Sequence, residues 1–195
     1  PSCLSTCGGV LYILSVCRPS VFRPLEANSE IQMGRQGSSL AELARVISAS
    51  ELGAIAVRAA VERSGIDVND VQEVIMGNVV TAGVGQAPAR QAAIGGGVPE
   101  TVPALTINKV CGSGLQAVML ADQSIRAGDN HIVVAGGFEN MTRAPHLASV
   151  RSGVKFGDAS MVDHMAHDGL TCAFEEWGMG FAAEHIAAKH GITRE

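Results

Sequence analysis

The chain alternates between apolar runs of strand length and segments whose apolar residues recur with the period of a helix. The first clear helix is predicted over residues 48–65, where Ser48 and Glu51 have the spacing of a capping box and Gly65 provides a left-handed end. The residues expected on its buried stripe are Leu52, Ile55, Ala56, Ala59 and Ala60. Three further helices are predicted by similar patterns, over residues 86–94, 112–127 and about 180–190.

Runs rich in Val, Ile and Leu predict the strands. Buried strands are predicted over residues 71–80, 102–108 and 132–135. A single additional strand is predicted over residues 10–16, followed by an irregular loop that contains proline and glycine. Because strands and helices alternate, we expect an α/β fold in which a layered sheet is connected by right-handed crossovers.

The regular alternation ends after residue 139. Residues 140–180 show little periodicity and contain scattered Gly, Met, His and Asp, and such a stretch is too long for an ordinary connection. We interpret it as a loop subdomain entered from the sheet. The expected organisation is an N-terminal segment (1–33), an α/β part (34–139) and a loop subdomain (140–195).

Composition narrows the classes of partner. Apolar residues make up 47% of the chain and aromatic residues only 4%, so the core is expected to consist of closely packed small aliphatic side chains. The net charge of −5 disfavours binding to nucleic acid. The longest apolar run, residues 8–16, is about half as long as a bilayer-spanning helix, so we expect a soluble protein without membrane association.

The five cysteines favour a reducing compartment, because they are odd in number and irregularly spaced. A cytoplasmic location is expected, although the composition of the first 33 residues leaves a leader peptide, and with it a mitochondrial or peroxisomal location, open. His164 and His167 lie near two aspartates in sequence and could ligate a metal. A polar loop surface explains them equally well, and no metal is expected.

Cys111 is the candidate nucleophile. A predicted buried strand leads into Asn108-Lys-Val-Cys111, which is followed at once by Gly112-Ser-Gly114 and a helix. At such a helix start, backbone amides and the helix dipole stabilise a thiolate, and glycines leave amides accessible to a developing oxyanion. Two other interpretations remain open at this point: Cys111 is a buried small hydrophobic residue, or the turn binds phosphate. The phosphate interpretation lacks both the GxGxxG and the GxxxxGK patterns.

The segment 108–115 resembles the active-site segment of thiolases, in which the cysteine accepts an acyl group. Further segments are similar to the same family in the same order: Glu51–Gly53, Val74–Asn78, Gly85–Gln91, Val134–Met141 and Asp168–Leu170. The resemblance covers about residues 34–195 and implies a thiolase-like layered fold, represented here by its first α/β half and part of the loop subdomain. The second half, with an activating histidine and a second catalytic cysteine, is expected to lie outside these 195 residues.

The resemblance also implies a function. Cys111 would form an acyl-cysteine intermediate from acyl-CoA without a further cofactor, and Leu170 and Met179 would line the channel for the pantetheine and acyl groups. The expected reaction is the condensation of two acetyl-CoA molecules to acetoacetyl-CoA, or the reverse thiolysis, by a full-length homodimer or homotetramer.

Two alternatives to this function stay open. Gly178 stands where acetoacetyl-type thiolases often have histidine, which favours a 3-ketoacyl-CoA thiolase of fatty-acid oxidation. The other alternative is a truncated, catalytically inactive binding or interface module, because these residues alone lack the second half and are expected to be inactive.

Overall fold

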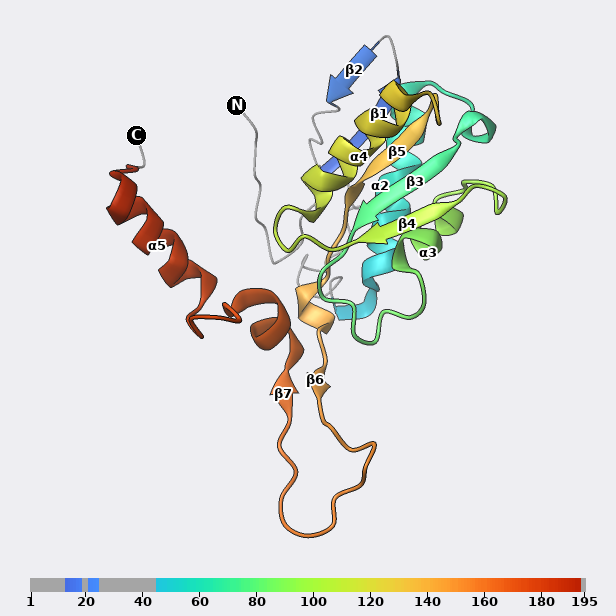
Figure 1. Cartoon of the computed structure of the whole chain (residues 1–195). Helices are drawn as coiled ribbons and strands as arrows, with labels where there is room; N and C mark the ends of the chain where they lie inside the picture. Colours follow the sequence, from blue (N-terminus) through green and yellow to red (C-terminus); the bar gives the residue numbers. More distant parts are fainter. Residues whose placement is uncertain (1–12, 19–20, 25–44, 194–195) are drawn as a thin grey trace, which may run out of the picture. The chain divides into compact units, whose positions relative to one another are not determined.

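The protein is described by a computed structural model that covers residues 13–18, 21–24 and 45–193. The chain divides into two compact units, with the boundary between Arg143 and Ala144 (Figure 1). We describe each unit by itself.

The first unit is built on a five-stranded mixed sheet with the order β2-β1-β5-β3-β4. Its strands, in chain order, are β1 (Ile13–Arg18), β2 (Val21–Pro24), β3 (Glu73–Gly77), β4 (Ala104–Ile107) and β5 (Val133–Gly137). Strand β3 is parallel to both β4 and β5, whereas β1 is antiparallel to β5 and to β2. The prediction of an α/β fold is confirmed, with a parallel centre and an antiparallel edge.

Three helices cover the two faces of this sheet (Figure 1). They are α2 (Ala49–Ser64), α3 (Pro88–Gly95) and α4 (Ser113–Ala127), and their positions confirm the predicted helices. Short 3-10 helices lie at Val68–Asp70 (η1) and Met141–Arg143 (η2). Side chains of α2 and α3 share a core with Val74 and Met76 of β3, whereas α4 packs with Ile75 from the other face of the same strand.

The N-terminal prediction needs a correction. Strand β1 continues two residues beyond the end of the predicted strand over residues 10–16, whose first three residues lie outside the described part. The irregular loop predicted after it is wrong at residues 21–24, which form strand β2. Pro24 is the last residue of β2, which is the outermost strand of the sheet among the described residues, a position at which proline is tolerated.

Two burial predictions are also wrong. Ile55 was expected on the buried stripe of its helix but is 43% exposed, because α2 approaches α3 through smaller residues. A Cβ at Gly53 would lie only 2.9 Å from the Cβ of Ala92 in α3. Strand β4 was expected to be fully buried, yet Leu105 is 44% exposed, because β4 is the other edge of the described sheet.

The second unit contains few regular elements. They are the two-residue strands β6 (His146–Leu147) and β7 (Val162–Asp163), which pair antiparallel, the π-helix η3 (Met165–Leu170) and helix α5 (Met179–His190). Helix α5 confirms the helix predicted over about 180–190. Among the described residues of this unit only His164 is buried.

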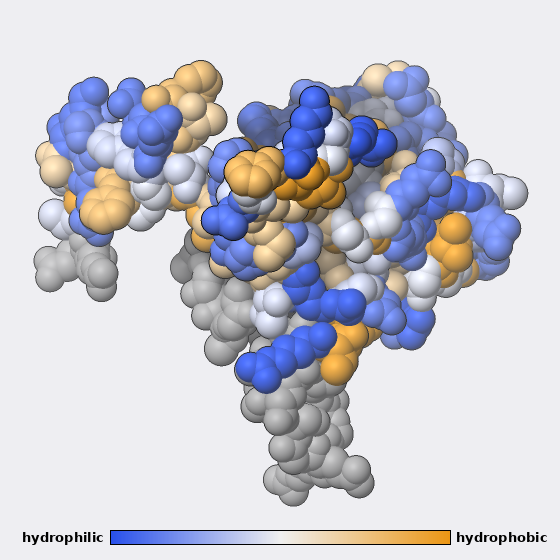
Figure 2. Space-filling model, turned by 90° about the horizontal axis from the view of Figure 1, so that it is seen from below, coloured by the Kyte–Doolittle hydropathy of each residue, from blue (hydrophilic) through white to orange (hydrophobic). Residues whose placement is uncertain are grey.

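Large apolar side chains are exposed in both units. They include Leu115 and Met119 on α4, and Phe156, Phe174 and Phe181 in the second unit. Figure 2 shows hydrophobic residues interspersed with hydrophilic ones on one face. No helix in the described ranges combines the length and the apolar character needed to span a bilayer.

Candidate active site

Cys111 lies immediately before helix α4, whose N-cap is Gly112. Strand β4 ends at Ile107, so only a short turn separates the sheet from the cysteine. The Cys111 side chain is exposed. This position directly before the helix is the one predicted from the sequence. The role of Cys111 as nucleophile stays a prediction.

The turn that carries Cys111 is held from beneath by Ser113. Its hydroxyl accepts a hydrogen bond from the Lys109 amide at 2.8 Å and donates one to the Val110 carbonyl at 2.6 Å. Ser113 is only 4% exposed. The carboxamide oxygen of Asn108 also accepts a hydrogen bond from the Val110 amide at 2.9 Å. These bonds fix the turn from its inner side while the cysteine faces outward.

Val110, the residue before Cys111, has a φ angle of +48°. A β-branched residue rarely adopts this left-handed conformation, which costs on the order of 1–3 kcal/mol. The hydrogen bonds of Asn108 and Ser113 hold Val110 in it. Strain of this kind often marks a site whose geometry serves chemistry.

The amides at the start of α4 are not all accessible. The sequence suggested that Gly112 and Gly114 would leave theirs open, but the Gly112 amide donates to the Lys109 carbonyl at 3.1 Å. No hydrogen bond among the described residues uses the amide of Cys111. No side chain caps this helix start. The Cys111 amide, together with the helix dipole, is therefore available to stabilise negative charge near the sulfur.

Glycines at two strand ends let α4 approach the sheet closely. A Cβ at Gly77, the last residue of β3, would lie 2.5 Å from the Cβ of Ser113 and 2.8 Å from the Gly114 amide nitrogen. A Cβ at Gly137, the last residue of β5, would lie 3.3 Å from the Cα of Gly114. Sequence reasoning missed the roles of Ser113, Gly77 and Gly137. The glycines at the ends of two apolar runs were the only signal for them.

The two residues expected to line the substrate channel are in the second unit. An antiparallel bridge joins Thr171 to Gly178, and it brings Leu170 and Met179 to the two sides of one short loop. Leu170 is 38% exposed at the end of the π-helix, and Met179 is half-buried at the start of α5. Their contact with substrate remains a prediction.

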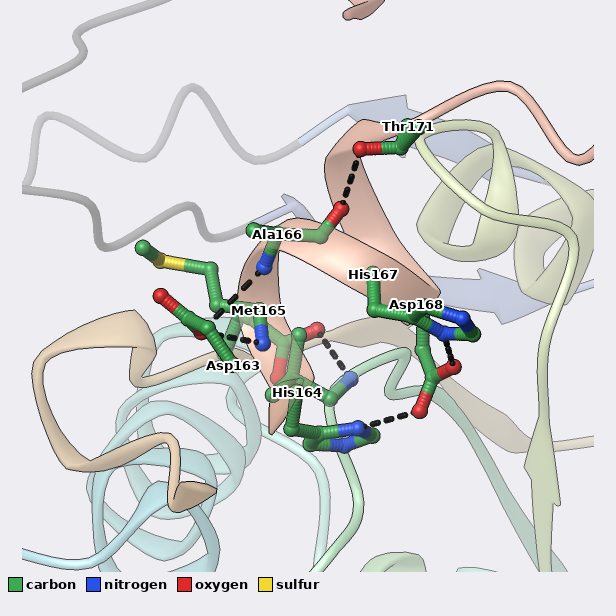
Figure 3. Close-up of polar contacts among 9 residues, drawn as sticks. Asp163, His164, Met165, Ala166, His167, Asp168 and Thr171 are labelled. Atoms are coloured by element: carbon green, nitrogen blue, oxygen red, sulfur yellow. Dashed lines mark hydrogen bonds and ion pairs between the residues drawn. The ribbon is translucent and has the colours of Figure 1, made fainter. Parts of the chain in front are cut away.

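Two histidines and two aspartates near the π-helix of the second unit form two separate groups (Figure 3). The Asp168 carboxylate shares hydrogen bonds with Nδ1 of His164 at 2.5 Å and with Nδ1 of His167 at 2.7 Å. The hydrogen bond from His167 makes the largest contribution to lowering the pKa of Asp168, and the hydrogen bond from His164 makes the next largest. Asp163 instead accepts hydrogen bonds from the amides of Met165 and Ala166 at the start of the π-helix.

These hydrogen bonds give each of the four side chains a partner among the described residues. No group of three or more potential metal ligands occurs among the residues that the structure describes.

Cys172, also in this unit, has its pKa lowered by hydrogen bonds from the backbone of Glu175 and Phe174 and by one from the Trp177 side chain.

Comparison with known proteins identifies the family. Residues 29–195 match the family model for the N-terminal domain of thiolase. The chain is 57% identical over 164 residues to acetyl-CoA acetyltransferase of Cupriavidus necator, covering 84% of this chain and 41% of that protein. It is 53% identical over 150 residues to acetyl-CoA acetyltransferase of Pseudomonas aeruginosa, covering 76% and 38%.

A third relative carries a broader name. The chain is 51% identical over 150 residues to a probable acetyl-CoA acyltransferase of Staphylococcus aureus, covering 76% of this chain and 38% of that protein. The chain thus spans about two fifths of the length of these curated relatives. The resemblance seen in the ordered sequence segments is confirmed, and the chain belongs to the thiolase family of acyltransferases.

Proposed function

We propose that the protein is an acetyl-CoA C-acetyltransferase, in which Cys111 carries the acyl group. The observation that carries this proposal is an exposed cysteine at an uncapped helix start, with its own amide unused among the described residues. The names of the relatives agree with this reaction class.

The proposed chemistry proceeds in two transfers. The Cys111 thiolate attacks the thioester carbonyl of one acetyl-CoA, and the carbon–sulfur bond to CoA breaks, so that CoA leaves as a thiolate and takes up a proton. A second acetyl-CoA then loses a proton from its methyl carbon. That carbon attacks the acetyl-cysteine carbonyl and releases Cys111, which yields acetoacetyl-CoA; thiolysis is the reverse.

The residues described here account for part of this chemistry. Charge on the tetrahedral oxygen would be stabilised by the Cys111 amide at the helix start. The base that activates the thiol and the acid–base group for the second transfer are expected in a second α/β half like that of other thiolases. Leu170 and Met179 would line the channel for the pantetheine and acyl groups.

The alternative of a 3-ketoacyl-CoA thiolase is supported by one feature. Gly178, the N-cap of α5, has no side chain and leaves no polar group beside Met179. The two reactions are separated by comparing the turnover of acetoacetyl-CoA with that of a longer 3-ketoacyl-CoA by the full-length protein. We expect the short substrate to be preferred, and a marked preference for the longer one would establish the alternative.

The alternative of an inactive module concerns the 195 residues on their own. The exposed Leu115 and Met119 on α4 support it, because an apolar helix surface favours association with another part of the protein. We expect these residues alone to release no CoA from acetyl-CoA. Detectable release would remove this alternative.

We further propose that the full-length protein is a homodimer or homotetramer. The half-exposed edge strand β4 supports this assembly, because an edge of this kind can pair with another chain. Sedimentation equilibrium of the full-length protein tests it, and a monomer at micromolar concentration would contradict it.

A further inference from the structure

The carboxyl ends of three neighbouring strands are tied together by Asn78, the residue that follows β3. Its backbone amide donates a hydrogen bond of 3.0 Å to the carbonyl of Ile107, the last residue of β4. The turn that carries Cys111 begins at the next residue. The backbone of Asn78 therefore fixes the point from which the nucleophile turn leaves the sheet.

The side chain of Asn78 reaches the opposite neighbour, strand β5. Its Nδ2 donates to the carbonyl of Phe138 at 3.1 Å and to Oε1 of Glu139 at 2.7 Å. Both acceptors lie just beyond β5, so the two amide hydrogens set the orientation of the carboxamide.

This arrangement is a poor means of stabilising the fold. Asn78 is 1% exposed, and its Oδ1 has no hydrogen-bond partner among the described residues. A buried oxygen without a partner lowers stability. Asn78 therefore serves to place the neighbouring strand ends rather than to increase the free energy of unfolding.

Glu139 completes the connection with its second oxygen. Oε2 accepts hydrogen bonds from the amides of Val79 at 2.8 Å and Val80 at 3.2 Å. Among the described residues, the carboxylate thus receives three N–H donors on its two oxygens, all from the segment that directly follows β3. A glutamine could not replace it, because its NH2 group would face at least one of these donors.

We propose that Asn78 and Glu139 are positioning residues for Cys111, which they place through the hydrogen bond from Asn78 to Ile107. This proposal builds on the proposed function of Cys111 as the nucleophile. Neither residue supplies a group to the reacting atoms. They fix the edge of the sheet that presents the thiol and the start of α4.

The opposite end of the same sheet offers a matched control. Glu73, the first residue of β3, accepts a hydrogen bond of 2.9 Å from Nδ2 of Asn130, which also donates to Ser124. This is again a hydrogen-bonded glutamate–asparagine pair that links β3 to the segment next to β5, but it lies at the end of the sheet away from the nucleophile turn. Glu73→Gln and Glu139→Gln make the same chemical change at opposite ends of the parallel strands β3 and β5.

The test compares these two variants with the wild-type full-length protein. The rate of alkylation of Cys111 by iodoacetamide and the kcat and KM for acetoacetyl-CoA thiolysis are measured, with thermal unfolding as a check on folding. For Glu139→Gln we expect at least about a tenfold fall in kcat and slower alkylation, with KM changed less than about twofold. For Glu73→Gln both rates should equal those of the wild type.

The direction of the alkylation change distinguishes positioning from charge. Removing a negative charge by itself would favour the thiolate and speed alkylation, whereas displacing the turn from the helix start slows it. Wild-type rates or faster alkylation in Glu139→Gln would overturn the proposal. Equal losses in both glutamine variants would also overturn it, because they would indicate general loosening of the sheet.

A second variant covers the case in which Glu139→Gln does not fold. Glu139→Asp keeps the charge but shortens the reach, and we expect its kcat to lie between those of the wild type and a fully disrupted turn. Wild-type kcat and alkylation in Glu139→Asp would overturn the proposal. If the wild-type protein transfers no acetyl group, the proposed function fails, while the alkylation rates still decide the positioning of Cys111.

Discussion

Helices α2 and α4 cover opposite faces of one sheet but begin in opposite ways. At the start of α2, the hydroxyl of Ser48 accepts a hydrogen bond from the Glu51 amide at 3.2 Å, and the Glu51 carboxylate accepts one from the Ser48 amide at 2.6 Å. At the start of α4, Gly112 offers no side chain, and the exposed Cys111 stands before it.

The difference separates a helix start that serves stability from one that we propose serves chemistry. The capping box of α2 satisfies amides that would otherwise be unpaired, and it needs no other part of the protein. The start of α4 is held from its inner side by Ser113 and by the close approach of Gly77, so its outer side stays open. Changes at the start of α4 should therefore alter activity first, and changes at the start of α2 should alter stability alone.

The largest effect is expected for Cys111→Ser. A serine hydroxyl is a much weaker nucleophile than a thiolate, so kcat for thiolysis by the full-length protein should fall by at least about 10³-fold. Because Cys111 is exposed, the thermal unfolding midpoint should stay within about 2 °C of the wild type. Substantial residual turnover would show that another residue carries the acyl group.

Gly77→Ala should affect both activity and stability. The added Cβ would meet the backbone of Ser113 at 2.7 Å, so the start of α4 must move away from β3. We expect a loss of roughly 1–3 kcal/mol in the free energy of unfolding, and about a 10²-fold fall in kcat because Cys111 moves with the helix.

Gly128→Ala is the matched control for this change, because Gly128 caps the other end of the same helix. It has a φ angle of +85° and no atom within 4 Å of an added Cβ. Its replacement should cost roughly 1–2 kcal/mol through backbone strain and leave kcat unchanged. Equal losses of kcat in both variants would contradict a special role for the start of α4.

Much of this architecture could be predicted from the sequence because the determining interactions are local. The pair Ser48 and Glu51 sets the start of α2, and Gly65 sets its end, as predicted. The strand–turn–helix order likewise located Cys111 before α4.

The rest depends on contacts between residues far apart in sequence. The exposure of Ile55 depends on where α3 packs, and the contact of Gly77 with Ser113 depends on how α4 crosses the sheet. The positive φ of Val110 depends on a hydroxyl three residues later being buried beneath the turn. None of these could be read from periodicity or spacing.

Ser48→Ala tests whether the start of α2 contributes to stability alone. Removing the N-cap hydroxyl should lower the free energy of unfolding by about 1 kcal/mol, measured by chemical denaturation. The kcat should be unchanged, because the start of α2 is separate from the nucleophile turn. A loss of activity in this variant without loss of stability would break the proposed division between the two helix starts.

The smallest effect is expected in the pH dependence of stability. The hydrogen bond from the Ser48 backbone makes the largest contribution to lowering the pKa of Glu51, followed by the hydrogen bond from the Ser48 side chain. Because the pKa of Glu51 is lower in the folded state, its ionised carboxylate stabilises the fold above the unfolded-state pKa. This stabilisation is lost as pH falls through the folded-state pKa. Glu51→Gln should therefore be less stable than the wild type at neutral pH, and the two should converge below the ordinary glutamate range. A constant difference over acidic pH would contradict this.

The most direct test of the account is to find where the acyl group is held. Full-length protein is mixed with acetyl-CoA, quenched in acid and digested, and the peptides are analysed by mass spectrometry. We expect one acetyl group on the peptide that contains Cys111, which added CoA removes and which is missing from Cys111→Ser. Acetylation of another residue, or none at Cys111 while the protein turns over substrate, would contradict it.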